Sequence, residues 1–178
     1  MPVSTRSTNN VPKIELALLS ASVLEALNAG SIDRASAEFG RQLPPSFLDH
    51  TSLWGYRIAQ VREDPSVLRW LVRAVVDANT QEIVGHAGFH GPPDDSGMVE
   101  IGYTIEPDFR RRGYARATVA ALIDYASAEP GVTRVRASIS PDNDASLATI
   151  RPFGFVQVGE QMDEIDGLEL IWELGVGS

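Results

Sequence analysis

The fold is decided by residues 99–116, which read Val99-Glu-Ile-Gly-Tyr-Thr-Ile105-Glu-Pro-Asp-Phe-Arg110-Arg-Arg-Gly113-Tyr-Ala-Arg116. Apolar and β-branched residues up to Ile105 predict a strand, which a Glu-Pro-Asp turn ends. After Gly113 the apolar residues recur at helical spacing and predict an amphipathic helix whose face is Ala115, Val119, Leu122, Ile123 and Ala126. The predicted order is therefore a strand, a short loop of arginines and glycine, and a helix.

A helix that starts after such a loop presents backbone N–H groups that have no partner within the helix. These donors and the positive end of the helix dipole favour an anion, most often a phosphate. Three arginines in a first turn oppose the helix dipole unless an anion is bound. We therefore predict a phosphate cradle at Arg110 to Ala115, and the alternative is a solvated basic first turn.

Composition limits the classes of protein to which the chain can belong. The sequence has 178 residues, of which 43% are hydrophobic and 22% charged, and its net charge is −9. No apolar run approaches the ~18 residues of a membrane span, and residues 1–10 form a polar tail without the apolar core of a secretory signal. We expect one domain at residues 11–178 in a cytoplasmic protein.

Several kinds of site are disfavoured by the same sequence. An acidic chain repels nucleic acid, so we expect no nucleic-acid partner. The absence of cysteine removes thiolate nucleophiles and thiolate metal ligands. The three histidines, His50, His86 and His90, do not have metal-binding spacing, so we expect no metal. No membrane association is expected either.

The remaining elements follow from hydrophobic spacing and turn residues. The sequence predicts strands at 11–19, 68–77, 82–90, 98–105, 133–139, from 153 onward and at 168–174, with a hairpin turn at Asp166-Gly167. It predicts helices at 20–29, 32–39, within 47–63, from 115 and at 145–151. Because a helix separates the strands ending at Ile105 and Ile139, these two strands are expected to be parallel. The fold class is mixed α/β.

Once the strand, loop and helix are placed, Arg110-x-x-Gly113-x-Ala115 resembles the acyl-CoA signature Q/R-x-x-G-x-G/A of the GNAT superfamily of N-acetyltransferases. Asn143-x-x-Ser146, followed by Gly154-Phe155, is similar to the second motif of that superfamily. Glu100-Ile101-Gly102-Tyr103 resembles the branch containing the ribosomal-protein-alanine N-acetyltransferases. The resemblance covers about residues 70–174. It implies a mostly antiparallel sheet of six to seven strands, with a splayed parallel pair and flanking helices.

The resemblance also implies a cosubstrate, acetyl-CoA, and a set of residues that bind it. These are Tyr103, Thr104, Ile105, Arg110, Arg111, Arg112, Gly113, Tyr114, Ala115, Asn143 and Ser146. Arg111 is expected to face solvent more than ligand. Asn143 and Ser146 also fit a plain helix start, as N-cap and third residue. Many family members have a tyrosine as general acid seven residues after the asparagine, where this chain has Ile150. Either Ser146 or a water would serve instead, or the thiolate would leave unprotonated.

Glu100 is the first candidate for the general base. A carboxylate within an apolar strand is costly to bury unless it is paired or hydrated. It shares a strand face with Gly102 and Thr104, while Ile101, Tyr103 and Ile105 share the other. The alternative role is an ion pair with Arg73, and Tyr103, Asp49 and His86 are weaker candidates for the base.

These observations predict an acyl-CoA-dependent N-acyltransferase that transfers acetyl to a primary amine by direct attack. Expected acceptors are a peptide N-terminus, an aminoglycoside or a small amine such as a polyamine, bound beside the acidic segment around 162–168. One alternative is a non-catalytic acyl-CoA-binding or sensor module. Another is an enzyme that uses a larger donor such as succinyl-CoA. The apolar last strand is a candidate for pairing across a homodimer.

Overall fold

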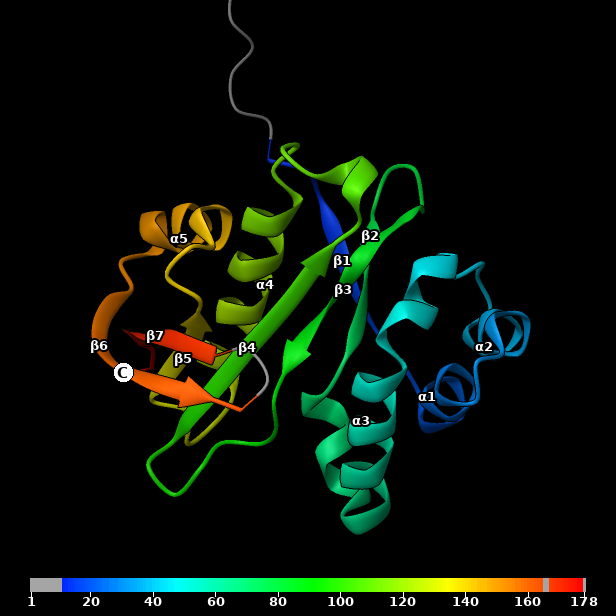
Figure 1. The fold of residues 1–178 in the computed structure, drawn as a ribbon, viewed down its shortest axis with the longest axis horizontal. Helices are drawn as coiled ribbons and strands as arrows, with labels where there is room; N and C mark the ends of the chain where they lie inside the picture. The colour runs from blue at the N-terminus through cyan, green and yellow to red at the C-terminus, as the bar shows by residue number, and fades with distance from the viewer. Residues whose placement is uncertain (1–10, 165–166, 178) are drawn as a thin grey trace, which may run out of the picture.

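The computed structural model describes residues 11–164 and 167–177 and has a single seven-stranded sheet, ordered β1-β2-β3-β4-β5-β7-β6 (Figure 1). Its strands are β1 (Ile14–Leu18), β2 (Arg73–Asp77), β3 (Ile83–Phe89), β4 (Met98–Ile105), β5 (Arg134–Ile139), β6 (Val156–Asp163) and β7 (Gly167–Gly175). Its α-helices are α1 (Ala21–Asn28), α2 (Ile32–Phe39), α3 (Thr51–Glu63), α4 (Tyr114–Ala128) and α5 (Asp144–Ile150). Only the β4–β5 pair is parallel among the described strands. The predicted fold class is therefore confirmed.

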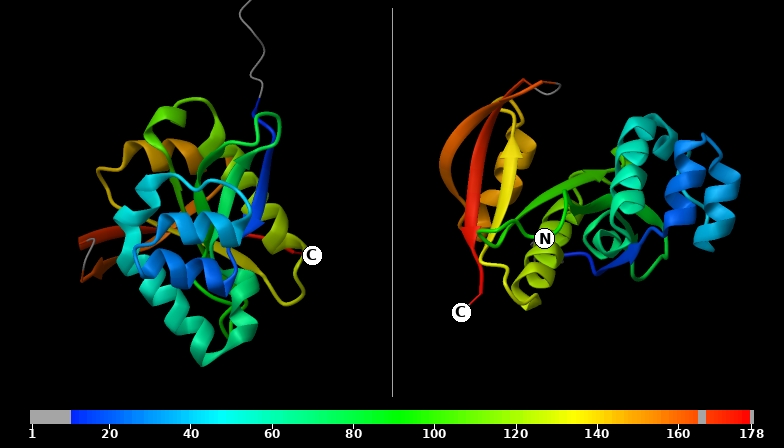
Figure 2. Two further views of the ribbon diagram at one scale, coloured as in Figure 1. Left: turned by 90° about the vertical axis from the view of Figure 1, so that its right-hand side faces the viewer. Right: turned by 90° about the horizontal axis from the view of Figure 1, so that it is seen from below.

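Alternation along β2 sends its side chains to two different hydrophobic cores. Val75 packs into a core on the α4 side of the sheet, and Ala74 and Val76 pack into a core with α1 to α3. Because successive side chains in a strand point to opposite faces, this one strand joins both cores. All five of its residues are buried, so the sheet lies between two helical layers (Figure 2).

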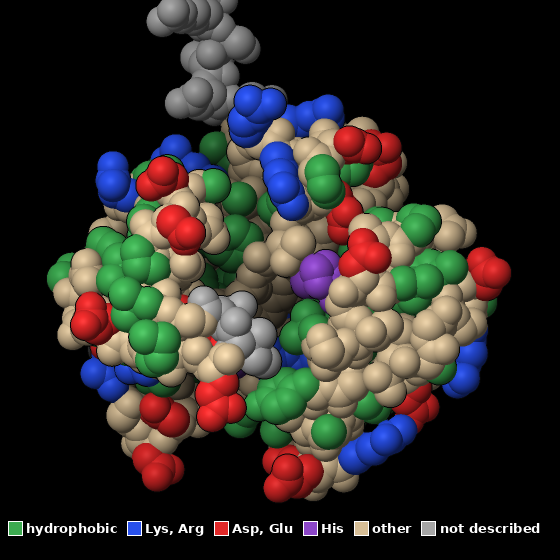
Figure 3. All heavy atoms as spheres, viewed as in Figure 1, with side chains coloured by type: hydrophobic (Ala, Val, Ile, Leu, Met, Phe, Trp, Pro, Cys, Tyr) green, Lys and Arg blue, Asp and Glu red, His purple; other side chains and the backbone are tan. Residues whose placement is uncertain are grey.

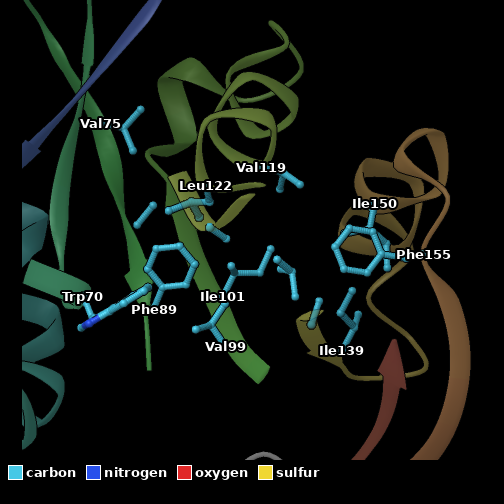
Figure 4. Packing of buried hydrophobic residues seen from close by; sticks show 14 of the residues in the cluster. Trp70, Val75, Phe89, Val99, Ile101, Val119, Leu122, Ile139, Ile150 and Phe155 are labelled. Atoms are coloured by element: carbon cyan, nitrogen blue, oxygen red, sulfur yellow. The ribbon is translucent and has the colours of Figure 1, made fainter. Parts of the chain in front are cut away.

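Helix α4 forms as its spacing predicts. Val119, Leu122 and Ala126 are buried against the sheet, and Ala115 and Ile123 pack partly against the same core. Figure 4 shows Leu122 and Val119 of α4 above Phe89 and Ile101 of the sheet. Val119 lies on the side toward Ile150 of α5. This packing fixes the start of α4 beside the end of β4.

The parallel pair opens after a short contact. Pairing joins Met98 with Arg134, Val99 with Val135 and Glu100 with Arg136, and no later residue of β4 is paired with β5. Both strands continue, β4 to Ile105 and β5 to Ile139, so their backbones diverge. Figure 2 shows β5, β7 and β6 standing away from the rest of the sheet. The predicted splay is thus present, beginning just after Glu100.

Three local predictions are wrong. The segment predicted as a strand from Leu68 begins as a 3-10 helix (Pro65–Trp70), because Asp64 caps it through Ser66 and Pro65 suits a first helical turn. The segment from 153 remains in a 3-10 turn (Arg151–Phe153), and β6 begins only at Val156. The last strand, β7, is paired on both sides by β5 and β6, so it offers no free edge for a homodimer.

Other segments agree with the sequence or lie outside the described residues. The helix predicted within 47–63 is α3, preceded by a 3-10 helix (Pro45–His50). A third 3-10 helix (Pro107–Phe109) follows β4. Residues 1–10 and the first residue of the Asp166-Gly167 turn lie outside the described residues. Within the described residues, no helix has the length and apolar character to cross a membrane.

Candidate active site

Four cavities follow one another from the arginine loop to the inner face of β3 and β4. The first, of about 480 Å³, lies between the starts of α4 and α5, and it shares Ile105, Arg110 and Ala115 with a second of about 340 Å³. The second shares Tyr103, Asn143 and Ser146 with a third of about 660 Å³ at the splay. The third shares His90, Gly102 and Tyr103 with a fourth of about 330 Å³. Figure 3 shows the hollow in the middle of this face, with several Lys and Arg side chains above it.

The predicted phosphate cradle lies at the first cavity. No side chain caps the start of α4, and the backbone N–H groups of residues 111–116 have no acceptor among the described residues. Gly113 has a φ of 88°, which favours glycine, and a Cβ there would lie 3.1 Å from Pro12 Cδ. The helix start therefore keeps its donors open to an anion.

The three arginines of the loop are exposed, and two of them are oriented by neighbours. Arg110 donates from Nε to the carbonyl oxygen of Ile105 at 2.9 Å, so this carbonyl at the end of β4 already has a partner. The guanidinium of Arg112 lies over the Phe109 ring, 5.6 Å from its centroid. Arg111 has a φ of 58° and is exposed, and it also lines the first cavity. The loop thus places positive charge along the first cavity.

Tyr114 reaches the site through its backbone only. Its side chain is buried, and its hydroxyl donates to Asp77 Oδ2 at 2.5 Å. This hydrogen bond is the main reason that the pKa of Tyr114 rises to about 12. It is also the main cause that holds the pKa of Asp77 below its usual value. The predicted ligand contact of Tyr114 is therefore confined to its N–H group.

Glu100 lies at the point where β4 and β5 separate. Its side chain is 20% exposed, and Ser138 of β5 donates a hydrogen bond to Glu100 Oε1 at 2.6 Å. Arg73, the alternative partner, donates instead to the carbonyl oxygens of Leu71 and Arg69. Glu100 is therefore not neutralised by Arg73, and it lines the third cavity.

His90, for which no role was predicted, lies beside Glu100. His90 Nδ1 is 3.7 Å from Glu100 Oε1. Burial lowers the pKa of His90, Arg57 lowers it further, and Glu100 acts in the opposite direction. The register of β3 against β4 sets residue 90 opposite residue 100, and their backbones are hydrogen-bonded. Knowledge of this register would have revealed the contact.

The weaker candidates for the base lie in different surroundings. His86 is buried against Phe47, Trp54 and His50, and burial lowers its pKa to about 3. Its Nε2 atom is buried without a partner among the described residues. Asp49 is exposed and lines none of the four cavities. Tyr103 lines three of them, but its hydroxyl is buried and unpartnered in the described structure.

The second motif lies at the start of α5. Asn143 Oδ1 accepts a hydrogen bond from the N–H group of Ser146 at 3.1 Å, so Asn143 caps this helix. Both residues also line the second and third cavities. Ile150 is 1% exposed and lies in the core beneath α5 (Figure 4). The Ile150 side chain therefore lines none of the four cavities.

The third cavity is acidic. Glu100, Asp163 and Glu169 line it, and the described residues of its lining include neither lysine nor arginine. Gln161 donates to Glu169 Oε2 at 2.9 Å, which fixes one of these carboxylates at the wall formed by β6 and β7. Three carboxylates around one cavity favour a cationic ligand.

A family model described as an acetyltransferase (GNAT) domain matches residues 20–156. The chain belongs to the GNAT family. This family is one of acetyltransferases. The matched region contains β4, the arginine loop, α4, and the Asn143 and Ser146 pair, so the predicted resemblance is confirmed.

Curated relatives carry N-acetyltransferase names. The chain is 38% identical over 82 residues to the uncharacterized N-acetyltransferase YjdG of Bacillus subtilis, covering 46% of this chain and 49% of that protein. It is 29% identical over 101 residues to YoaA of the same species, covering 57% of this chain and 55% of that protein. The chain spans about half the length of the curated relatives it matches.

Solved structures share the fold over nearly the whole chain. The microcin C7 self-immunity acetyltransferase MccE, in complex with acetyl-CoA and AMP, has a TM-score of 0.64 and 21% identity, covering 94% of each chain. The ribosomal-protein-S5-alanine acetyltransferase of Vibrio fischeri has a TM-score of 0.63 and 18% identity, covering 98% of this chain and 97% of that one. Ribosomal-protein acetyltransferases are thus among its structural neighbours.

Proposed function

We propose that this protein transfers an acetyl group from acetyl-CoA to a primary amine by direct attack on the thioester. The observation that carries the proposal is the unbroken series of cavities from the uncapped start of α4 to the acidic cavity at the splay. Such a path would hold a long phosphorylated donor at one end and an amine at the other.

The donor would lie along the first two cavities. Its pyrophosphate would accept hydrogen bonds from the backbone N–H groups of Arg111 to Ala115, with the positive end of the α4 dipole behind them. The N–H group of Arg110 already donates to the Pro107 carbonyl oxygen. Arg110 and Arg111 line the first cavity and would add positive charge at its edge, with Arg112 next to them in the loop. The pantetheine arm would pair with the β4 edge at Tyr103 to Ile105, beside Asn143 and Ser146. The Ile105 carbonyl, which already accepts from Arg110, would contribute less.

The transfer needs a neutral amine, a stabilised oxyanion and a leaving thiolate. The amine nitrogen attacks the thioester carbon, whose carbonyl electrons move to oxygen and accept a hydrogen bond from a backbone N–H of β4. Glu100 provides the negative charge that draws the proton from the amine. When the tetrahedral intermediate collapses, Ser146 protonates the sulfur, or the thiolate leaves unprotonated because a thiol has a pKa of only ~8.5.

The acceptor is a cationic amine bound in the third cavity. Glu100, Asp163 and Glu169 attract a protonated amine, and the lining offers no opposing Lys or Arg. Peptide N-termini, amino-sugars and polyamines share this chemistry. Structural neighbours include a spermidine N-acetyltransferase and ribosomal-protein acetyltransferases, which agree with the proposal of an amine acceptor.

A direct test measures free-thiol release from acetyl-CoA with a panel of amines. We expect release with at least one cationic amine and a sequential initial-rate pattern. The rival is a non-catalytic acyl-CoA-binding or sensor module, which the absence of a tyrosine at position 150 favours. Tight CoA binding without release for any amine would establish the rival.

The acyl group is tested by comparing donors at a fixed amine. We expect acetyl-CoA to be the best donor, and a higher kcat/KM with succinyl-CoA would replace this part of the proposal. The acceptor site is tested with Glu169→Gln, which should raise KM for a dication more than for a monocation. Glu160→Gln is the matched control, because Glu160 is exposed on β6 and lines none of these cavities.

A further inference from the structure

We propose that His90 is the immediate acceptor of the amine proton and that Glu100 acts through it. The inference rests on the proposed amine acetylation and names the base of that same site. Its starting point is the position of the imidazole, which lines both the acidic cavity and the adjoining fourth cavity. The side chain is 51% exposed, so an incoming amine can reach it.

The backbone of His90 is held firmly while its ring stays accessible. Arg57 of α3 donates to the His90 carbonyl oxygen at 2.7 Å, and Gln60 donates to the same oxygen at 3.0 Å. The His90 N–H group donates to the carbonyl oxygen of Glu100 at 2.8 Å. These bonds from α3 and β4 fix the backbone from which the imidazole extends. A proton acceptor requires such a fixed position relative to the amine.

A glycine on the neighbouring strand makes room for the ring. A Cβ at Gly102 would lie 3.0 Å from His90 Nε2, so the imidazole lies over the site where any other residue would place a side chain. Gly102 is on β4, two residues beyond the end of the β4–β5 pairing. His90 Nε2 thus lies over the part of β4 that faces the splay, where the thioester is proposed to bind.

The two ring nitrogens have different surroundings. Nδ1 is 3.7 Å from Glu100 Oε1, which is beyond hydrogen-bond distance. The negative charge of the carboxylate favours a hydrogen on the nearer nitrogen, Nδ1, and with that tautomer the lone pair of Nε2 is free. Ser138 already donates to Glu100 Oε1 and holds that carboxylate in place. As Nε2 takes the amine proton, the imidazolium forms next to a fixed carboxylate, which stabilises its charge.

The charged groups around His90 come from three elements. They are Arg57 on α3, Glu100 on β4 and Glu169 on β7. Burial and Arg57 favour the neutral ring, whereas Glu100 and Glu169 favour the protonated ring. The net direction is a pKa below 6.5, so the ring is neutral at pH 7 and ready to accept a proton.

The proton balance of the step is complete. The acceptor ammonium gives one proton to His90 Nε2, and the freed amine lone pair forms the C–N bond of the tetrahedral intermediate. As the intermediate collapses and the C–S bond breaks, the second proton of the attacking nitrogen passes to the leaving sulfur through Ser146 or water, which gives the amide and the CoA thiol. The imidazolium then releases its proton to water. His90 returns to its neutral form without any oxidant or further reactant.

The test is the pH profile of kcat/KM for His90→Gln and Glu100→Gln, with thiol release as readout. We expect His90→Gln to lower kcat/KM by about 100-fold at pH 7 and to abolish the acid limb. The loss should shrink toward pH 10, where the acceptor amine is free without a base. His50→Gln is the matched control, since His50 lines none of the four cavities, and should keep both the rate and the limb.

Glu100→Gln separates the two candidates for the base. If His90 accepts the proton, removal of the Glu100 charge lowers the pKa of His90 and moves the acid limb to lower pH without abolishing it. If Glu100 itself is the base, the limb disappears in Glu100→Gln and persists in His90→Gln, which would overturn the proposal.

Proton NMR titration of the wild-type protein provides a readout other than turnover. The His90 signal is the imidazole resonance that is absent from the spectrum of His90→Gln, and its pKa in the wild-type protein should coincide with the midpoint of the acid limb. A midpoint displaced from the pKa of His90 by more than a unit would reject His90 as the base. Thiol release by the wild-type protein tests the proposed function separately, so failure of one leaves the other standing.

Discussion

The Tyr114 hydroxyl donates a 2.5 Å hydrogen bond to Asp77, which ties the first residue of α4 to the last residue of β2. Asp77 also accepts hydrogen bonds from the N–H groups of Asn79 and Thr80. The carboxylate therefore joins the β2–β3 turn to the helix start at which we place the phosphate cradle. This contact connects the stability of the sheet to the position of the donor site.

Removal of that contact should be measurable as a change in stability. Tyr114→Phe is expected to lower the free energy of unfolding by about 1 to 2 kcal/mol at pH 7, because the hydrogen bond to a carboxylate is lost. The pKa of Asp77 is lowered in the fold, so its contribution is present above its unfolded pKa and is lost as pH falls through the folded pKa. Urea unfolding at pH 7 and pH 3 should therefore show a smaller difference between variant and wild type at the lower pH. An equal difference at both values would exclude the ionised carboxylate as the source.

Ionisation of Tyr114 should change the stability at alkaline pH. Its pKa is raised to about 12, so the contribution of its neutral hydroxyl is complete below pH 10 and is lost as pH rises toward 12. Wild-type protein should lose stability across this interval more steeply than Tyr114→Phe. Urea unfolding of both proteins at pH 9 and pH 11 provides the measurement. An equal change in the free energy of unfolding between the two pH values for both proteins would contradict the assignment.

Gly113→Ala should impair binding of CoA as well as stability. The φ of 88° strains any residue with a Cβ, and the new methyl group meets Pro12 at 3.1 Å. Movement of the loop would displace N–H donors of the cradle, so we expect affinity for CoA to fall at least tenfold by calorimetry. Gly131→Ala is the matched control, because its φ of 84° imposes similar strain while its Cβ would meet nothing within 4 Å. If the two variants bind CoA equally well, the cradle is not at Gly113.

The arginine loop should make CoA binding dependent on salt. Arg112→Ala removes a charge at the cradle and should weaken CoA binding several-fold at low ionic strength, with a smaller effect at 0.5 M salt because screening is stronger. Arg62→Ala is the control, since Arg62 is exposed on α3 and pairs with Glu25 at 3.3 Å. Titrations at two salt concentrations measure the difference. A loss of the same size for Arg62→Ala would show that overall charge, not the loop, controls affinity.

Ser146→Ala tests the proposed proton donor. A thiolate of pKa ~8.5 can leave without protonation, so we expect only about a tenfold loss of kcat, with KM for acetyl-CoA little changed. The loss should grow as pH rises above 8, where solvent protonates the thiolate less readily. Ser127→Ala on α4, whose hydroxyl bonds only the Ile123 carbonyl oxygen among the described residues, is the control. An unchanged kcat across pH would assign the role to water.

The parts of the fold that rest on regular spacing were predictable from sequence. Val119, Leu122 and Ala126 recur at helical intervals and are all buried, and the strands around Val75 and Ile101 follow their alternation. The segment from Leu68 was not predictable, because its apolar run fits a strand as well as a short helix. The cap at Asp64 and the proline after it decide between the two.

The site was predictable only where backbone geometry follows from sequence order. Gly113 with its positive φ and the uncapped helix start appear where the strand, loop and helix require them. His90 was missed because its contact with Glu100 depends on the register of β3 against β4. A shift of two residues in this register would place Met98 opposite His90. The turn-rich loop between the strands does not determine the register. Gly102 leaves room for the imidazole of His90, but a glycine in a strand does not by itself predict such a contact.

The short β4–β5 contact divides the sheet into two blocks, β1 to β4 and β5 to β6, that share only three residue pairs. A pantetheine arm that hydrogen-bonds to the free edges beyond Glu100 would occupy the place of a missing strand. Ligand binding would then link the two blocks mechanically and slow amide hydrogen exchange on both strands, far beyond the atoms that touch the ligand. In this protein the donor substrate would complete the architecture of the sheet before it takes part in the reaction.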